Sequence, residues 1–220
     1  MNTKTFFRIL LTAAAVILAS GCATKAPYDY SAFKESRPRS IVVLPPINKS
    51  PEIPATYSVL SYATRPLAEA GYYVMPVTLV AEAFKENGMT EPTDMHATSA
   101  EKLRQIFGAD AALYITISRY GTVYQVVNSE SLVAAQANLV DLKTGKTLWS
   151  GAAQASSAES DSNQSGSLAV LLISAIIKQV VASTTDHSHQ IAGVATARLL
   201  YPRPNGGLLY GPRSPNYGKD

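Results

Sequence analysis

The sequence predicts a single α/β domain of three layers, in which helices flank a mixed sheet. Two patterns carry this prediction. In the first half of the chain, short apolar runs alternate with helical periodicity, as in consecutive βαβα units. In the second half, segments with strand alternation follow one another across tight turns, which is typical of an antiparallel meander. We place the domain at residues 40–201, a length that can enclose one hydrophobic core.

The first 21 residues predict an export signal that is removed. Lys4 and Arg8 precede an apolar run at 9–19, and small residues follow it before Cys22. A basic start, a short apolar run and a small-residue cleavage site are the parts of a secretory signal. The run is too short for a membrane-spanning helix, which needs about 20 residues.

The segment 22–39 is polar and mixed, with prolines at 27 and 38. We interpret it as a tether between the membrane and the domain.

Two short apolar runs predict the strands of the first half. Residues 40–44 form a continuous run that ends at Pro45, and residues 72–75 form another that ends at Pro76. A strand that is covered on both faces loses its alternation, so the first run indicates a buried strand, and the second run indicates another strand.

Three helices are predicted in the same half, and a glycine follows each of them. They span 55–70, 77–87 and 99–107, and the last begins with a capping-box pattern at Thr98-Ser99-Ala100-Glu101. Glycine just past the last turn is the usual helix end.

The meander begins at residue 111. Alternation predicts strands at 111–118, 121–127, 132–141 and 147–155, with a tight turn at 143–146 in which Gly145 supplies a positive φ. The Ser-rich stretch 156–167 is interpreted as a flexible loop, and a last helix is predicted at 187–200.

A mostly apolar helix is predicted at 168–181. It either packs into the core or buries its second face against another subunit, and both alternatives stay open. Its candidate interface residues are Leu168, Leu172 and Ile176.

The tail 202–220 is rich in proline and glycine, yet it holds Leu208, Leu209 and Tyr210 in a row. A purely disordered tail rarely carries such a cluster. We interpret the tail as an irregular arm that docks through these three residues, either on its own domain or on a partner.

Charge and cysteine content exclude several functional classes. The chain has 19 basic and 16 acidic side chains, and two of the basic ones lie in the export signal, so the mature protein is nearly neutral. No basic cluster interleaves with aromatic residues, so we expect no nucleic-acid binding. Cys22 is the only cysteine, which excludes a disulfide within the monomer.

Candidate catalytic and metal sites are weak. Gly145-Lys146-Thr147 lacks the upstream glycine of a phosphate-binding loop. His187 and His189 are two residues apart and point away from each other on a helix, and His96 with Asp94 supplies too few ligands for a structural metal. We therefore expect no metal, no cofactor and no enzymatic activity.

Leu18-Ala19-Ser20-Gly21-Cys22 resembles the lipobox of bacterial lipoproteins, with Ala19 where leucine is preferred. The resemblance implies that Cys22 receives a diacylglycerol and then an acyl chain such as palmitate, which together anchor a protein stably. Ala23, in the place where aspartate would retain the protein in the inner membrane, implies an outer-membrane anchor. The domain would then face the periplasm or the cell surface.

The domain itself resembles the family of outer-membrane lipoproteins typified by a meningococcal surface antigen. The segments that carry the resemblance are IVVLPPIN at 41–48, GYYVMPV at 71–77, FKENG at 84–88, PTDMH at 92–96, IFGADAALYI at 106–115, LVDLKTG at 139–145 and LWSG at 148–151. The family implies a fold similar to the N-terminal domain of TolB and to the periplasmic domain of the curli secretion channel. It also implies a partnership with a channel-type outer-membrane lipoprotein, and dimers.

The leading hypothesis is therefore a lipid-anchored interaction module of an envelope transport or secretion assembly. One alternative is a regulator of a periplasmic cell-wall enzyme, and another is a small-ligand-binding lipoprotein. A tether of 22–39 would extend to at most ~60 Å at ~3.5 Å per residue, which favours a partner near the outer membrane.

Overall fold

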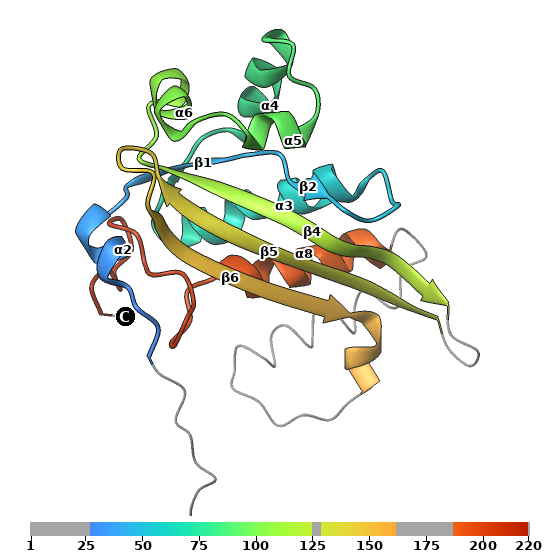
Figure 1. Ribbon diagram of the computed structural model, residues 1–220. Coiled ribbons are helices and arrows are strands. Elements are labelled where there is room, and N and C mark those ends of the chain that lie inside the picture. Colours follow the sequence, from blue (N-terminus) through green and yellow to red (C-terminus); the bar gives the residue numbers. More distant parts are fainter. Residues whose placement is uncertain (1–26, 125–128, 162–186, 220) are drawn as a thin grey trace, which may run out of the picture.

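The computed structural model describes residues 27–124, 129–161 and 187–219 (Figure 1). The predicted export signal, Cys22 and the predicted helix 168–181 with Leu168, Leu172 and Ile176 lie outside these residues. In the described part of the chain, no helix is both long and apolar enough to cross a membrane.

A six-stranded mixed sheet forms the centre of the molecule, with β3, β1, β4, β5 and β6 side by side in that order and β2 also paired with β4. The parallel half joins β1 to β3 and to β4, and the antiparallel half joins β4 to β5 and β5 to β6. The strands are β1 (Ser40–Val43), β2 (Ile47–Asn48), β3 (Tyr73–Val74), β4 (Ala111–Tyr124), β5 (Ser129–Asp141) and β6 (Thr147–Ser156). The predicted mixed sheet with a C-terminal meander is confirmed.

Helices cover the two faces of the sheet unequally (Figure 1). α3 (Ala55–Glu69) and α8 (His187–Leu200) cover one face, whereas the other carries α4 (Val77–Glu86), α5 (Pro92–His96) and α6 (Ala100–Phe107). The two remaining short helices are α2 (Ser31–Ser36) and the 3-10 helix η1 (Ser157–Asp161). Among the described residues, three layers therefore exist over the parallel half, and α4 to α6 leave the antiparallel half uncovered on their side.

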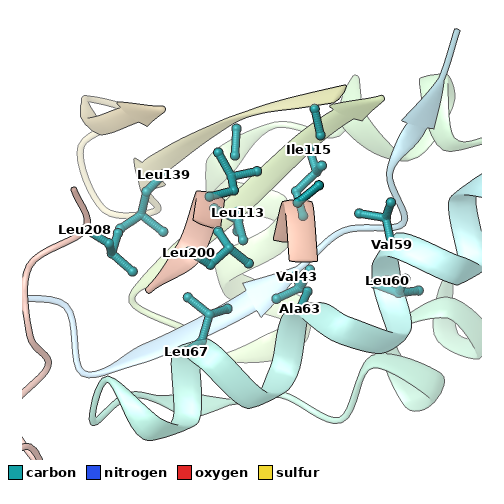
Figure 2. Packing of buried hydrophobic residues seen from close by; sticks show 14 of the residues in the cluster. Val43, Val59, Leu60, Ala63, Leu67, Leu113, Ile115, Leu139, Leu200 and Leu208 are labelled. Atoms are coloured by element: carbon teal, nitrogen blue, oxygen red, sulfur yellow. The ribbon is translucent and has the colours of Figure 1, made fainter. Parts of the chain in front are cut away.

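The larger core lies between the sheet and α3 with α8 (Figure 2). Val43, Leu113 and Leu139 project from the strands and meet Leu67 of α3 and Leu200 of α8, all of them fully buried. Burying one such side chain stabilises the fold by about 1.5–3 kcal/mol.

A second, smaller core lies beneath α4, α5 and α6. Val42 of β1 and Leu44 just after it reach this core, while Val80 and Phe84 reach it from α4. Since Ile41 and Val43 enter the larger core, β1 is buried on both faces, as its unbroken apolar sequence predicts.

The predicted strands 111–118 and 121–127 are one strand, so this division was wrong. β4 pairs with β5 continuously from Ala111↔Asp141 to Tyr124↔Ser129, with a bulge between Ile117 and Arg119. The extra residue of a bulge shifts the alternation. As a result Ile117 and Tyr120 both enter the core although they are three residues apart, so the alternation does not continue in phase through the strand.

The boundaries of the domain also need correction. Phe33 of α2 is buried, so the part of the predicted tether from Tyr28 onwards belongs to the folded body. At the other end, Leu208 and Leu209 are buried well beyond residue 201. Aromatic and leucine side chains in these two polar, proline-rich segments supply the apolar area that holds them on the domain.

Candidate interaction surfaces

The two ends of the described chain bind each other. We call the contact of residues 28–38 with residues 206–218 the terminal junction. The rings of Tyr28 and Tyr30 pack with centroids 4.7 Å apart. The Tyr30 hydroxyl donates to the Gly207 carbonyl at 2.6 Å and accepts from the Gly206 N–H at 3.0 Å. One tyrosine thus satisfies two backbone groups of a segment that has no regular secondary structure.

Strand β6 holds both ends of the junction. The indole N–H of Trp149 donates to the Gly206 carbonyl at 3.0 Å, and the N–H of Ser150 donates to the Tyr28 hydroxyl at 2.8 Å. The Trp149 ring lies directly over Gly151, where an added Cβ would be 2.2 Å from the ring. Residue 151 must therefore be glycine for the indole to reach the tail.

The tail also pairs with the turn after α3. The N–H of Gly211 donates to the Ala70 carbonyl at 2.7 Å, and the N–H of Arg213 donates to the Gly71 carbonyl at 3.1 Å. Gly71 has φ +96, and a Cβ there would be 2.4 Å from the Ser214 nitrogen. Only glycine allows the two backbones to approach so closely.

These contacts decide where the three candidate residues of the tail lie. Leu208 is 1% exposed and Leu209 is 8% exposed, and both join the larger core. Of the two alternatives that the sequence left open, the structure therefore shows the tail docked on its own domain, and Leu208 and Leu209 are not available as a surface for a partner. Tyr210 stays partly exposed.

Tyr210 lines a pocket of about 440 Å³ in the terminal junction, which we call the junction pocket. Apolar and aromatic side chains from α2, from Tyr72 just before β3 and from the tail form most of its wall, and two cations complete it. The main contributors are Phe33, Lys34, Arg37, Tyr72, Tyr210 and Tyr217. Of the described residues, no acidic side chain lines the pocket.

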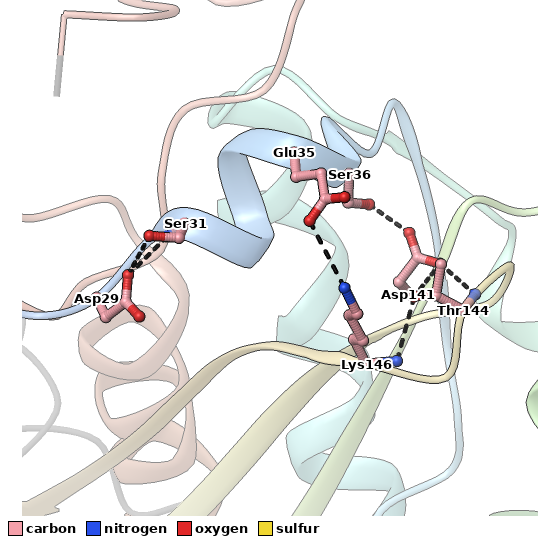
Figure 3. A network of polar contacts seen from close by, with 7 residues as sticks. All are labelled: Asp29, Ser31, Glu35, Ser36, Asp141, Thr144 and Lys146. Carbon is pink, nitrogen blue, oxygen red and sulfur yellow. Dashed lines mark hydrogen bonds and ion pairs between the residues drawn. The ribbon is translucent and has the colours of Figure 1, made fainter.

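A separate network attaches α2 to the turn between β5 and β6 (Figure 3). Asp141 accepts hydrogen bonds from the Ser36 hydroxyl, from the Lys143 N–H at 2.8 Å and from the Thr144 N–H at 2.6 Å. Burial alone would raise the pKa of Asp141, but these donors outweigh burial and hold the pKa below its usual value. Glu35 pairs with Lys146 at 3.6 Å, so the acidic group next to Lys34 already has a cation.

The second surface is the uncovered side of the antiparallel half, on the same face as α4 to α6. Small and amide side chains alternate here with the core residues of β4, β5 and β6. We call it the open face, and its residues are Thr116, Ser118, Ala134, Gln136, Asn138, Ser150, Ala152 and Gln154. None of these eight is charged, and the exposed Arg119, the cross-strand partner of Ala134, borders them. A shallow hollow of about 280 Å³ lies between Ser118, Gln136 and Gln154.

Sequence reasoning missed a buried polar cluster between α3, α8 and β4. The Ser58 hydroxyl oxygen lies 2.7 Å from Nδ1 of His189, and the Tyr120 hydroxyl donates to Ser58 at 3.0 Å. Tyr62 stacks on the His189 ring with centroids 4.7 Å apart. No local sequence pattern predicts this cluster, because its members are far apart in the sequence. Ser58 is only 6% exposed, and the cluster joins three elements of the core.

His96 does not form a pair with Asp94. Its Nε2 lies 2.9 Å from the Pro45 carbonyl, and its ring meets Tyr114 edge-on with centroids 5.2 Å apart. Burial lowers the pKa of His96. Within residues 27–124, 129–161 and 187–219, no three His, Cys, Asp or Glu side chains gather closely enough to hold a metal ion.

Comparison with known proteins gives two related findings. Residues 28–213 match the family model described as "Putative lipoprotein GNA1162-like". A curated protein of Neisseria meningitidis serogroup B (strain ATCC BAA-335 / MC58), "Putative lipoprotein NMB1124/NMB1162", is 48% identical over 207 residues, which cover 93% of this chain and 95% of that one.

A solved structure is similar as well. The crystal structure of lipoprotein GNA1162 from Neisseria meningitidis aligns with a TM-score of 0.54 and 49% sequence identity. The alignment covers 66% of this chain and all of that one.

Proposed function

The chain belongs to the GNA1162-like lipoprotein family, and from this membership we propose that it is a lipid-anchored interaction module of the outer membrane. In this proposal Cys22 carries the lipid, and the open face binds a protein component of an envelope transport or secretion assembly. The expected role is binding and not catalysis.

The composition of the open face carries the proposal. Eight neighbouring residues on three adjacent strands are uncharged, although 16% of the chain is charged, and the exposed Arg119 lies at their edge, opposite Ala134. Cores of protein interfaces are depleted in charged residues, because burying a charge without a partner is costly. Ala and Ser side chains also lose little rotamer entropy on burial. A partner that supplies aromatic or aliphatic side chains could therefore cover this face at low cost.

The corrected tether supports a partner close to the membrane. Because Tyr28 already belongs to the folded body, only the five residues 23–27 separate that body from Cys22. At ~3.5 Å per residue they span at most ~18 Å. This reach is much shorter than the predicted tether allowed, and it argues against a regulator that must cross the periplasm to a cell-wall enzyme.

Site-specific photocrosslinking in intact cells tests the proposal. A photoreactive residue at Gln136 or Ala152 on the open face should give one discrete adduct with an envelope protein. The control position is Lys102, which is exposed on α6. Ala134→Arg, also on the open face, should abolish the adduct while the protein stays folded. Adducts only from position 102, or adducts that persist in Ala134→Arg, would contradict the proposal.

A further inference from the structure

We propose that the junction pocket binds the anionic headgroup of a phospholipid from the leaflet that holds the anchor. This inference rests on the proposed lipid anchor and deepens it. The lipid would be a second contact of the domain with the membrane, formed by folded side chains and independent of the acyl chains on Cys22.

The charges of the pocket favour an anion. Lys34 and Arg37 both line it, and among the described residues neither side chain lies within ion-pair distance of a carboxylate. Glu35, which lies between them in sequence, pairs with Lys146 instead. Two cations therefore meet at one pocket with no acidic side chain of the described residues to neutralise them, and an anionic ligand would balance their charge.

The backbone at Arg37 adds a second observation. Arg37 is the C-cap of α2 and adopts a left-handed conformation, with φ 48 and ψ 57. Glycine or asparagine is the usual residue at such a helix end, because a Cβ there is sterically unfavourable. Here the residue is an arginine instead, and the Nε of Arg37 donates to the Lys34 carbonyl at 3.1 Å. This bond holds the start of the guanidinium group beside α2 while leaving its two terminal nitrogens for a ligand.

The remaining walls distinguish a lipid from free phosphate. Phe33, Tyr72 and Leu209 give the pocket an apolar floor, and Tyr210 and Tyr217 border it. A free phosphate has no apolar part to place on this floor, whereas the glycerol and first acyl carbons of a phospholipid do. Tyrosine, with an apolar ring and a polar hydroxyl, is also suited to the interfacial region of a bilayer.

The pocket residues lie close in the sequence to the proposed lipid anchor, which keeps the pocket near the membrane. Lys34 follows the first described residue by only seven positions, and the chain from Cys22 to residue 27 spans at most ~18 Å. An anchored domain therefore stays near the headgroup layer, where the lipid concentration is high. Each cation near an anionic surface contributes about 1 kcal/mol, so removing both should lower lipid occupancy by tenfold or more.

Native mass spectrometry of the full lipidated protein tests this proposal. The protein is reconstituted in nanodiscs of phosphatidylcholine with phosphatidylglycerol, released, and scored for retained phosphatidylglycerol. Lys34→Gln combined with Arg37→Gln should lose the retained lipid. The matched control is Lys102→Gln combined with Arg104→Gln, which removes two exposed cations from α6 and should retain it.

Further variants, a competition with phosphate and the intact mass distinguish a failure of the pocket from a failure of the anchor. Lys34→Gln alone leaves the left-handed residue untouched and should lower retention several-fold, and Lys34→Arg should restore it. Equal retention by the pocket variant and the control would overturn the proposal. So would displacement of the lipid by millimolar inorganic phosphate, which would reveal a simple anion site. The intact mass reports acylation of Cys22 separately, so failure of the anchor and failure of the pocket give different results.

Discussion

The two faces of the antiparallel half arise from alternate residues of the same strands, and they differ completely in character. On one face Val133, Leu139 and Trp149 are fully buried beneath α8 and the tail. On the other face Gln136, Ala152 and Gln154 are exposed. A shift of one residue along a strand therefore separates a position that stabilises the fold from one that is available for binding. Stability and partner binding should accordingly be separable by mutation.

The largest difference in stability is expected between a substitution at Leu139 on the core face and one at Gln136 on the open face. Leu139→Ala should lower the free energy of unfolding by about 2–5 kcal/mol, because it leaves a cavity in a well-packed core. Gln136→Ala, three residues away on the open face, should change it by less than about 0.5 kcal/mol. Denaturant unfolding of both variants measures the contrast. Comparable losses in the two would show that the open face is part of a packed interior.

A smaller loss of stability is expected when Gly151 of β6 is replaced, and its neighbour Ala152 supplies the control. Gly151→Ala should cost about 1–3 kcal/mol, because the new methyl group overlaps the Trp149 ring. The displaced indole should lose its bond to Gly206, and the fluorescence of this single tryptophan should shift to the red. Ala152→Ser is the control and should leave the melting temperature and the emission unchanged. An unchanged spectrum in Gly151→Ala would mean that the indole does not hold the tail.

The smallest effect is the pH dependence of the free energy of unfolding that His96 contributes, in the region where α5 covers the sheet. Burial lowers the pKa of His96 from its ordinary value of 6.5. A histidine whose folded pKa is lowered contributes its full stability above pH 6.5 and loses it progressively as the pH falls towards the folded pKa. Unfolding measured between pH 7.5 and pH 5 should therefore show declining stability. His96→Gln should flatten that decline, and an equal decline in the variant would assign the dependence to other groups.

Much of the fold could be predicted because its signals are local. The Ser99 side chain caps α6 by accepting from the Lys102 N–H at 3.2 Å, one residue after Thr98, the N-cap that the capping-box pattern indicates. Gly108 ends α6 in the left-handed region, and Gly145 has φ +71 in the turn before β6. Each of these features depends on a few consecutive residues, so a single sequence is enough to recognise it.

The interaction surfaces could be predicted only in part. The sequence identified Leu208, Leu209 and Tyr210 as a docking cluster, but it did not show where they dock. The hydroxyl of Tyr72, just before β3, donates to the Leu209 carbonyl at 2.6 Å and so joins this distant segment to the tail. Lys34 and Arg37 looked like residues of a tether. The junction pocket and the Ser58–His189 contact need segments more than a hundred residues apart, and no local pattern encodes such a pairing.

The sequence by itself determined the order of the main elements and the two-sided burial of β1, because periodicity, caps and composition act over short stretches. Only the tertiary structure decided that β4 is one bulged strand, that the tail docks on its own domain, and that α4 to α6 leave the open face uncovered. Those outcomes depend on which distant surfaces exclude water together, and that is a property of the assembled chain.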